Sequence, residues 1–214
     1  MTEISILRLP EDVDRWDLVT KFLFFRKDIF IDEMGWPLYH LDAMEFEQYD
    51  GWSTVYIIAH ENGEVQGGAR LLRTDARLGT GKYVYSYMIR DAWRSYLDGL
   101  PTNLCRSEPP VDPAVWELTR LTAGHNLGLA RDILNAANDY LRAQGARTCL
   151  FLGPPAFMRM AKSMGYKPES LGEVTGNKDG KFLAFQCAVI DRQSVATPPA
   201  GLGGRAGNEM RLAH

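Results

Sequence analysis

The chain has 214 residues, of which 45% are hydrophobic and 24% are charged, as expected for a globular domain with one core. Its formal net charge of -3, from 24 Lys and Arg against 27 Asp and Glu, argues against a nucleic-acid-binding protein, because such proteins usually carry a basic surplus. The three cysteines are widely spaced and the four histidines are scattered, which argues against a disulfide framework and a metal site. The chain has no apolar run long enough for a membrane span and no signal peptide. We therefore expect a cytoplasmic protein.

The first part of the chain predicts a short strand and then a long helix. The strand covers 4–9, and Asp12 or Asp14 could cap a helix that reaches about residue 34. Apolar side chains recur in this helix at steps of four, three and four, which predicts a core-facing stripe. The stripe consists of Leu18, Phe22, Phe25 and Ile29, with Arg26 and Phe30 along its edge.

An acidic loop and a hairpin follow the helix. The loop covers 37–52, and long loops of this kind are often functional. Its acids are Asp42, Glu45, Glu47 and Asp50. Two runs rich in β-branched and aromatic residues, 54–60 and 65–72, flank an Asn-Gly turn and predict the hairpin. Inside its second strand, Gly67 and Gly68 indicate a bulge or the close approach of another backbone.

The second half of the chain alternates strands and helices. Residues 73–112 form an aromatic-rich excursion, in which we expect a short strand or helix near 85–97. After it we expect a strand at 115–123, a glycine loop at 124–128, a helix at 129–144, a strand at 148–152, a helix at 154–164 and a strand at 181–190.

This order predicts an α/β fold, a three-layer α/β/α sandwich with a mixed, splayed central sheet. It resembles the layout of the GNAT-type acyltransferases, in which N–H groups of the glycine loop, at a helix N-terminus, hold the phosphates or amides of a pantetheine carrier. His125 in that loop is expected to be a surface residue. We expect a single domain over 1–190 and a flexible tail over 191–214, where Gly, Pro and Ala dominate.

Four short motifs contain most of the charged residues that lie beside large apolar ones. They are, in order, R-x-x-x-F at 26–30 with Trp36 six residues further, E-F-E-Q-Y-D at 45–50, R-L-L-R-T at 70–74 and W-E-L-T-R at 116–120. Together, over about residues 20–190, they resemble the motifs of the acyl-homoserine-lactone synthases, the LuxI-type autoinducer synthases. Three departures stand out: Glu47 occupies a position where the family normally has Asp, Arg73 replaces the usual Pro, and the 47 residues from Arg70 to Glu117 exceed the spacing expected for the family.

The resemblance implies a reaction and a set of residue roles. The amino group of S-adenosylmethionine would attack an acyl thioester on acyl carrier protein or coenzyme A, and its carboxylate would then close the lactone and expel methylthioadenosine. S-adenosylmethionine is a substrate in this reaction, so no cofactor is implied. The implied catalytic residues are Glu117, Arg70 and Arg120, and the implied S-adenosylmethionine-binding residues are Arg26, Phe30, Trp36, Glu47 and Asp50.

The residue types suit that chemistry. Carboxylates such as Glu47 and Asp50 can balance a sulfonium or ammonium, and arginines bind a carboxylate through their bidentate fork. Trp36 offers a ring face on which a sulfonium or an adenine can rest. Glu117 could accept the ammonium proton, directly or through water. N–H groups near Arg70 or after Arg120 could stabilise the oxyanion of acyl transfer.

The acyl chain would lie against the strand at 148–153 and the helix after it. The implied pocket residues are Cys149, Phe151, Gly153 and Phe157, with Tyr87 or Met88 as a looser candidate. Beyond Thr148 the strand offers no hydroxyl to bond a 3-oxo group, so we expect unsubstituted chains. The methionines of the next helix adapt to irregular apolar space and favour medium to long chains.

Acyl carrier protein is strongly acidic, so its docking face should be basic in spite of the net charge of the chain. Arg159 and Lys162 lie three residues apart on one face of the helix at 154–164, and Lys167 follows that helix. We expect these residues to dock the carrier, and we expect no obligate protein partner.

Other interpretations of the same residues stay open. Arg70, Asp50, Glu117 and Arg120 could form a buried ion network with only a structural task, and Trp36 could pack as a lid. The chain could be another N-acyltransferase of this fold that acts on a different amine, or a non-catalytic module that binds acyl carriers or S-adenosylmethionine. Glu117 and Arg120 would point to opposite faces of a regular strand, so a shared site requires either a bulge between them or a strand that ends near Thr119, and we expect the bulge.

Overall fold

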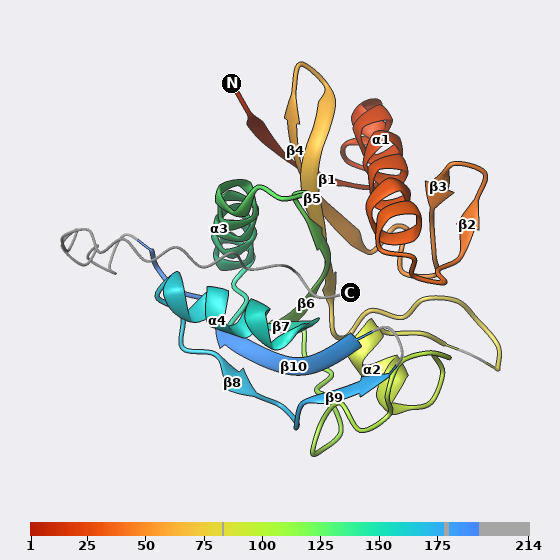
Figure 1. Ribbon diagram of the computed structural model, residues 1–214, viewed down its shortest axis with the longest axis vertical. Helices are drawn as coiled ribbons and strands as arrows, with labels where there is room; N and C mark the ends of the chain where they lie inside the picture. Colours follow the sequence, from red (N-terminus) through yellow and green to blue (C-terminus); the bar gives the residue numbers. More distant parts are fainter. Residues whose placement is uncertain (83, 178–179, 193–214) are drawn as a thin grey trace.

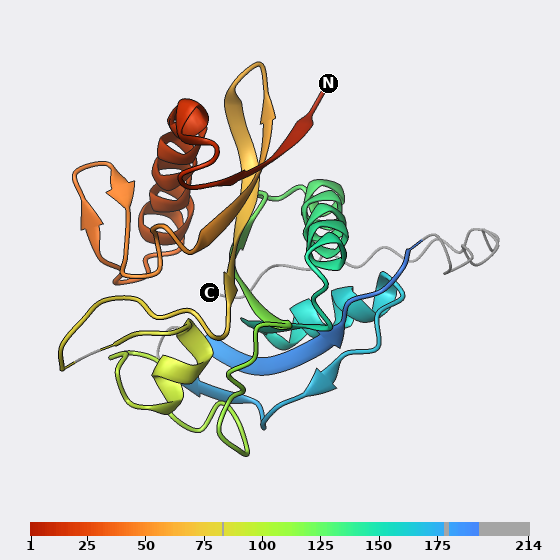
Figure 2. The same cartoon turned by 180° about the vertical axis from the view of Figure 1, so that it is seen from behind.

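A mixed sheet of eight strands runs through the molecule, and helices cover both of its faces (Figures 1 and 2). The computed structural model describes residues 1–82, 84–177 and 180–192. Along the sheet, the strands are β1 (Glu3–Arg8), β4 (Thr54–Glu61), β5 (Glu64–Arg73), β6 (Val115–Thr122), β7 (Thr148–Gly153), β10 (Gly180–Ala188) and β8 (Glu169–Ser170), while β9 (Thr175–Asn177) pairs with β10. The described strand pairs are antiparallel except for β6 and β7.

The pairing of β6 with β7 stops part-way along both strands. It ends at Leu118 opposite Phe151, although β6 continues to Thr122 and β7 to Gly153. The two parallel strands therefore part at their C-terminal ends. This is the predicted splay of the central sheet.

Helices α1 (Trp16–Lys27) and α2 (Met88–Trp93) pack on one face of the sheet, and α3 (Leu127–Ala143) and α4 (Pro155–Ser163) pack on the other. Strand alternation separates the two faces. Tyr56 and Ile58 of β4 pack with α1, whereas Val55 and Ile57 belong to the cluster that contains α3. The predicted three-layer α/β/α fold class is confirmed.

The predicted helix over 12–34 consists of three different helical geometries. A 3-10 turn (Val13–Arg15) precedes α1, and a π-helix (Asp28–Glu33) continues it. Asp12, one of the two expected alternatives, is the N-cap residue of the 3-10 turn, but its side chain makes no capping hydrogen bond there. Arg15 is the N-cap residue of α1, and the Asp12 carboxylate accepts a hydrogen bond from the N–H of Arg8 at 3.0 Å. π-helical turns are rare and are frequent at functional sites, which draws attention to this segment.

The buried face of this helix also differs from the predicted stripe. Leu18 and Phe22 are buried as expected. Val19, Leu23, Arg26 and Phe30 are buried as well, whereas Phe25 and Ile29 are only half-buried. Periodicity treats an arginine as polar, whereas this arginine is neutralised by carboxylates and takes a core position.

The hairpin of β4 and β5 is confirmed, and so are both expectations for its glycines. The register of the two strands shifts between Ala59 and His60, beside Gly67. A Cβ on Gly67 would lie 2.6 Å from the carbonyl oxygen of Thr122, and a Cβ on Gly68 would lie 2.7 Å from that of Ile57. The acidic loop before the hairpin contains a small two-stranded sheet, β2 (His40–Leu41) with β3 (Met44–Glu45).

The other elements of the second half lie within a few residues of their predicted ranges. The helix expected as one alternative near 85–97 is α2. Strands β8 and β9 were not predicted, because two or three residues give no periodicity. Of the predicted tail over 191–214, all but the first two residues lie outside the described part of the chain. No described helix is long and apolar enough to cross a membrane, and the described residues contain no His, Cys, Asp and Glu cluster that could hold a metal.

Candidate active site

Six charged side chains meet at the C-terminal end of α1 and form what we call the ion network. Its members are Arg26 of α1, Glu45 of β3, Glu47 and Asp50 of the acidic loop, Arg70 of β5 and Arg120 of β6. Three guanidinium groups face three carboxylates, so the formal charges balance. Buried charges are tolerated only when they are paired and hydrogen-bonded in this way.

Arg26 connects two of the carboxylates. Its Nε donates to Glu45 Oε2 at 2.5 Å, and its Nη1 and Nη2 donate to the two oxygens of Asp50 at 2.8 and 3.0 Å. Asp50 also accepts the hydroxyl of Tyr56 at 3.0 Å and the backbone N–H of Glu47 at 3.1 Å. The bidentate pair fixes both the position and the plane of the carboxylate.

Arg70 connects the acidic loop to the sheet. Its Nη2 donates to Glu47 Oε1 at 2.5 Å, and its Nε donates to Thr119 Oγ1 at 3.1 Å. Nη1 lies 3.1 Å from Asp50 Oδ2 without the alignment of a hydrogen bond. The guanidinium carbon lies 5.5 Å from the centre of the Tyr49 ring, within the range of a cation–π contact.

Arg120 reaches the network because of a bulge in β6. Between Thr119 and Thr122 the register with β5 shifts by one residue, and Arg120 has a positive φ of 54°. A left-handed arginine is uncommon, and such strain is typical of functional sites. The bulge lets Nη2 lie 3.1 Å from Glu45 Oε1 and 3.0 Å from Glu47 Oε2. A bulge is present as expected, but it lies at Arg120 itself, because Glu117, Leu118 and Thr119 still pair in register with β5.

The network is open to solvent at one edge only. The side chain of Glu47 is 15% exposed and that of Arg120 is 6% exposed, whereas Arg26, Asp50 and Arg70 have no exposed side-chain surface. Burial alone would raise the pKa of Glu47, but the guanidinium groups of Arg120 and Arg70 hold it below its ordinary value. Burial and the arginines oppose each other in the same way at Asp50, where the arginines also win and the pKa is lowered. Glu47 and Asp50 are therefore ionised.

Two aromatic rings stand beside the open edge. Trp36 is half-buried, and its ring stacks on that of Phe30 with centroids 5.3 Å apart and planes 10° apart. Arg120 lies 5.7 Å from the centre of the Phe30 ring. Trp36 therefore packs on the buried ring of Phe30 and keeps part of its own surface exposed. This agrees with both roles considered for it, a ring face for a ligand and a lid on the core.

Glu117 lies apart from the arginines and binds the backbone of α2. Its Oε2 accepts the N–H of Met88 at 2.9 Å, and its Oε1 accepts the N–H of Ile89 at 2.8 Å. Burial raises the pKa of Glu117 to about 7, because it outweighs the opposing effect of these two N–H groups and of Arg70. The Met88 sulfur lies 3.9 Å from Nη1 of Arg120, so Glu117 and Arg120 contact the same residue of α2.

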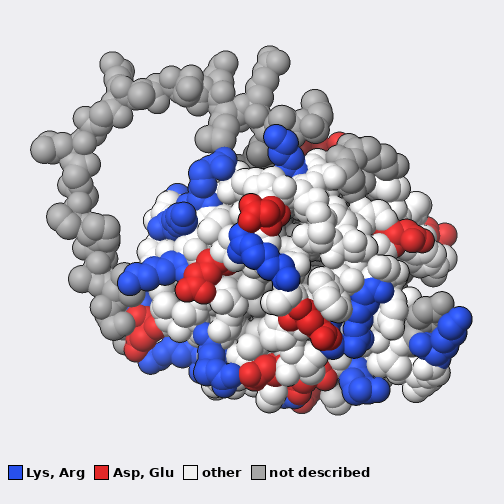
Figure 3. Space-filling model, turned by 90° about the horizontal axis from the view of Figure 1, so that it is seen from below, with Lys and Arg blue, Asp and Glu red and all other residues white. Residues whose placement is uncertain are grey.

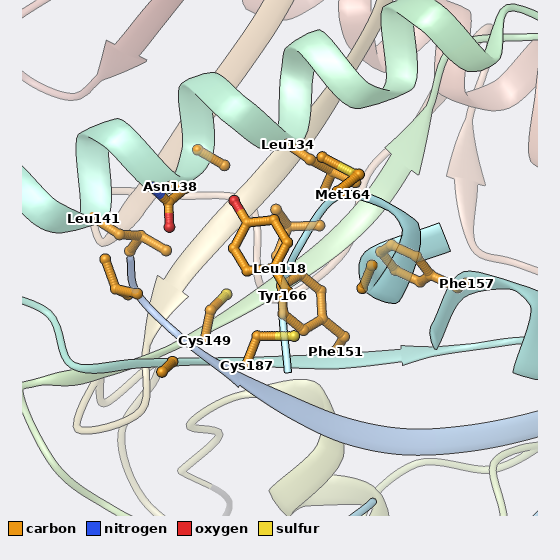
Figure 4. A pocket seen from close by; sticks show the side chains of 14 residues that line it. Leu118, Leu134, Asn138, Leu141, Cys149, Phe151, Phe157, Met164, Tyr166 and Cys187 are labelled. Atoms are coloured by element: carbon orange, nitrogen blue, oxygen red, sulfur yellow. The ribbon is translucent and has the colours of Figure 1, made fainter. Parts of the chain in front are cut away.

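A narrow apolar pocket lies between the sheet and helices α3 and α4 (Figure 4). Cys149, Phe151 and Phe157, which were expected to contact an acyl chain, line this pocket, and their neighbours are Leu118, Leu134, Leu141, Met164, Tyr166 and Cys187. Gly153 is not among the lining residues. Its lack of a side chain instead makes room for Phe157, since a Cβ there would lie 2.9 Å from Cδ1 of that ring. Of the looser candidates, Tyr87 is buried against α2 and Met88 borders the ion network, so neither lines this pocket.

The basic residues predicted to dock a carrier lie at the surface. Arg159 and Lys162 of α4 and the following Lys167 are exposed, and within the described ranges none of them pairs with an acid. His125 is also exposed, as expected, and lies 3.4 Å from a carboxylate oxygen of Glu33.

Comparison with known proteins agrees with this geometry. The family model described as autoinducer synthase matches residues 13–195. The chain belongs to the autoinducer synthase family. It is 29% identical to the acyl-homoserine-lactone synthase of Ralstonia solanacearum, over 78% of each chain, and 26% identical to that of Acinetobacter nosocomialis, over 72% of this chain and 83% of the relative.

Solved structures share the fold of this autoinducer synthase. The CoA-dependent acyl-homoserine-lactone synthase BjaI, solved with SAM and isopentyl-CoA, superposes with a TM-score of 0.74 at 21% identity and covers 90% of this chain and 85% of its own. A putative N-acetyltransferase from Lactobacillus plantarum superposes with a TM-score of 0.55 at 13% identity, over 88% of this chain and 99% of its own. The expected similarity to acyltransferase folds is thus confirmed.

The structure explains how this autoinducer synthase accommodates its departures from the family motifs. The longer arm of Glu47 reaches Arg70 with one oxygen and Arg120 with the other. Arg73 forms a surface pair with Asp75, two residues further along the chain. The long segment between the third and last motifs contributes α2, the helix that Glu117 binds.

Four residues of the site were not predicted from the sequence. Glu45 and Tyr49 lie inside the motif at 45–50, so the motif itself was the signal that could have identified them. Asp91 of α2 gave no signal, because its partner Tyr49 lies 42 residues earlier in the chain. Tyr166 of the apolar pocket follows α4 and has no motif around it.

Proposed function

We propose that this autoinducer synthase transfers an acyl group from a thioester to the amino group of S-adenosylmethionine and releases an N-acyl-L-homoserine lactone and methylthioadenosine. The observation that supports this best is the open edge of the ion network, where Arg120 pairs with Glu47 and lies over Phe30, the ring on which Trp36 stacks, in a chain of this family. BjaI was solved with SAM, and TofI with an inhibitor and MTA. Both substrates are made in the cytoplasm, where we place the reaction.

Exposure decides which groups of the network can meet the ligand. Glu47 faces its cationic groups, and Arg120 can bind its carboxylate through the guanidinium fork. The exposed part of Trp36 offers a ring face to the sulfonium or the adenine. Arg26 and Asp50 have no exposed side-chain surface, so we assign them the task of holding Glu47 and Arg120 in place.

The reaction proceeds in two bond-forming steps. The neutral amine attacks the thioester carbon, the carbon–sulfur bond breaks, and the carrier leaves as a thiol. A carboxylate oxygen of the same molecule then attacks its own γ-carbon, and the carbon–sulfonium bond breaks to release methylthioadenosine as a neutral thioether. The first step requires the loss of a proton from the ammonium. A group with a pKa near the working pH is best suited to accept that proton.

Glu117 is our candidate for the proton acceptor, and because it is only 1% exposed, the proton would reach it through a bridging water. Its pKa of about 7 matches that requirement. Both of its oxygens accept a backbone hydrogen bond, but each carboxylate oxygen keeps a second lone pair. Arg70 is buried, so its part in catalysis is to hold Glu47 and Asp50. N–H groups of β6 beyond Leu118, where β7 no longer pairs, are candidates to stabilise the oxyanion.

The apolar pocket between the sheet and helices α3 and α4 is our candidate for the acyl chain. Its cavity of about 30 Å³ has the room of about two water molecules on the same measure, so a chain can enter only when side chains move. Met164 and Phe157 line it, and methionine adapts readily. The expected preference for medium to long chains stays a prediction that depends on this movement.

The preference for unsubstituted chains can be tested at Tyr166. Thr148 is not among the lining residues. The side-chain amide of Asn138 is already hydrogen-bonded to the backbone of Ile190: its NH2 group donates to the carbonyl oxygen at 2.8 Å, and its oxygen accepts the N–H at 3.1 Å. Tyr166 carries the only hydroxyl among the described lining residues. Competition between 3-oxo and unsubstituted thioesters of equal length, scored by product mass, should favour the unsubstituted product. An excess of 3-oxo product that Tyr166→Phe abolishes would refute the preference and identify the donor.

The carrier is acyl carrier protein or coenzyme A, and the exposed basic residues of α4 support the former. On the face seen from below, Lys and Arg side chains lie among Asp and Glu side chains, so that face offers an acidic carrier no continuous basic surface (Figure 3). Arg159 and Lys162 have no described acidic partner and are the better candidates.

The decisive experiment is to incubate the protein with S-adenosylmethionine and mixed acyl thioesters and to measure methylthioadenosine. Its release together with an acyl-homoserine lactone supports the proposal. An acylated amine without methylthioadenosine would indicate another N-acyltransferase, and binding without product would indicate a non-catalytic module. Glu47→Gln should raise the KM for S-adenosylmethionine about tenfold or more, as loss of a charge-assisted contact of about 1.5 kcal/mol implies. Glu47→Asp, which keeps the charge, is the matched control.

A further inference from the structure

A buried carboxylate on α2 contacts the acidic loop. Asp91 has no exposed surface. Its Oδ2 accepts the hydroxyl of Tyr49 at 2.8 Å and the backbone N–H of Ser86 at 2.8 Å, and its Oδ1 accepts the Ser86 hydroxyl at 3.3 Å. The loop and the excursion over 73–112, which are far apart in sequence, are thereby tied together through one side chain.

Tyr49 connects this carboxylate to the ion network. It lies between Glu47 and Asp50 in the loop, and its side chain is buried. Its ring lies under the guanidinium of Arg70 at 5.5 Å. Burial and the neighbouring Asp91 raise the pKa of Tyr49, so its hydroxyl remains a donor. Its carbonyl oxygen accepts the hydroxyl of Thr54 at 2.6 Å, which fixes the backbone at the same point.

We infer that Asp91 is a positioning residue of the S-adenosylmethionine site: by holding Tyr49 it sets the place of the acidic loop, and so the place from which Glu47 meets the ligand. This inference rests on the proposed function for the identity of the ligand. Asp91 does not itself touch the open edge, because it is buried on α2 and its described hydrogen bonds go to Tyr49 and Ser86. Its effect must pass through the loop.

The test is Asp91→Asn, with S-adenosylmethionine affinity measured by calorimetry and turnover by methylthioadenosine release. An asparagine keeps one acceptor oxygen and replaces the other by a donor, so it cannot accept from all the donors that Asp91 serves. We expect the Kd and the KM for S-adenosylmethionine to rise about fivefold, since the Tyr49 hydroxyl exchanges a charged acceptor for a neutral one, a difference of about 1 kcal/mol. The KM for the acyl thioester should change less than twofold.

Two further variants separate positioning from general stability. Thr74→Val removes a buried hydroxyl that binds the backbone of Asp112 at 2.9 and 3.0 Å, at the two ends of the same excursion. It should lower the melting temperature and leave the Kd unchanged. Tyr49→Phe, which keeps the ring over Arg70, should weaken binding as Asp91→Asn does. In the Tyr49→Phe background, Asp91→Asn should add less than a twofold change.

Three results would overturn the inference. The first is an unchanged Kd in Asp91→Asn, and the second is an equal loss of affinity in Thr74→Val. The third is a Kd in the double variant of Tyr49→Phe and Asp91→Asn that rises by the product of the two single-variant factors. Each leaves the proposed function intact if the wild-type protein still releases methylthioadenosine. Failure of the wild-type protein to bind S-adenosylmethionine or to release methylthioadenosine would instead refute the proposed function.

Discussion

Replacing Glu117 by Gln should change how the stability of the protein depends on pH. Glu117 is 1% exposed, and burial raises its pKa from the ordinary 4.5 to about 7. A carboxyl group with a raised pKa binds its proton more tightly in the folded than in the unfolded chain. The pKa values of Glu117 in the folded and unfolded chain differ by about 2.5, and each pKa unit is worth about 1.4 kcal/mol, so the difference corresponds to roughly 3 kcal/mol of stability.

The sign follows from which state ionises first. Below pH 4.5 Glu117 is protonated in both states, and its contribution to stability is fully present. As the pH rises from 4.5 to about 7, the unfolded chain loses this proton while the folded chain keeps it, so the wild-type protein loses the roughly 3 kcal/mol. Above about pH 7 the loss is complete. The Gln variant has no proton to lose at this position.

Urea unfolding of both proteins at several pH values from 5 to 8 measures this effect. The other carboxylates are common to both proteins, so the difference between the two free energies of unfolding isolates Glu117. We expect the wild-type advantage over Glu117→Gln to shrink by most of the roughly 3 kcal/mol across this range. A difference that does not vary with pH would refute the reasoning. A wild-type advantage that grows with pH would show that the N–H groups of Met88 and Ile89 outweigh burial.

Three further predictions concern charge, packing and docking. Glu45→Gln leaves a buried guanidinium charge uncompensated and should lower the free energy of unfolding by about 3–5 kcal/mol; a loss near zero would mean that this charge is already solvated. Gly68→Ala should cost about 1–3 kcal/mol in thermal unfolding, because the new Cβ would lie 2.7 Å from a carbonyl oxygen of β4, whereas Gly51→Ala meets nothing within 4 Å and serves as control. Reversal of Arg159 and Lys162 to Glu should raise the KM for substrate on acyl carrier protein and leave that for acyl-CoA unchanged; if neither changes, the carrier docks elsewhere.

The four motifs contain all six residues of the ion network, and all of them except Glu45 were expected to belong to the site. The bulge at Arg120 was expected because the family resemblance implies one site for Glu117 and Arg120, whereas side chains three residues apart point to opposite faces of a regular strand. The structure meets this requirement with a left-handed residue.

Other features depend on partners that lie far away in the chain. Arg26 takes a core position only because Glu45 and Asp50, 19 and 24 residues later, neutralise it, and periodicity cannot contain that information. The tie between Asp91 and Tyr49 spans 42 residues and leaves no pattern near either of them. The π-helix at Asp28–Glu33 was predicted as a continuation of the α-helix, because its residues carry no pattern that distinguishes the two geometries.

The charge balance of the ion network has a consequence for the way a ligand approaches. With three guanidinium groups against three carboxylates, the site generates little field at a distance and cannot attract or repel a ligand by its total charge. Ionic strength should then have little influence on the association of a small zwitterionic substrate, because only contacts made at close range distinguish one charge arrangement from another. Discrimination at such a site depends on where the charges of the ligand lie, and a molecule of the same net charge with its groups in another order would find no complementary pair.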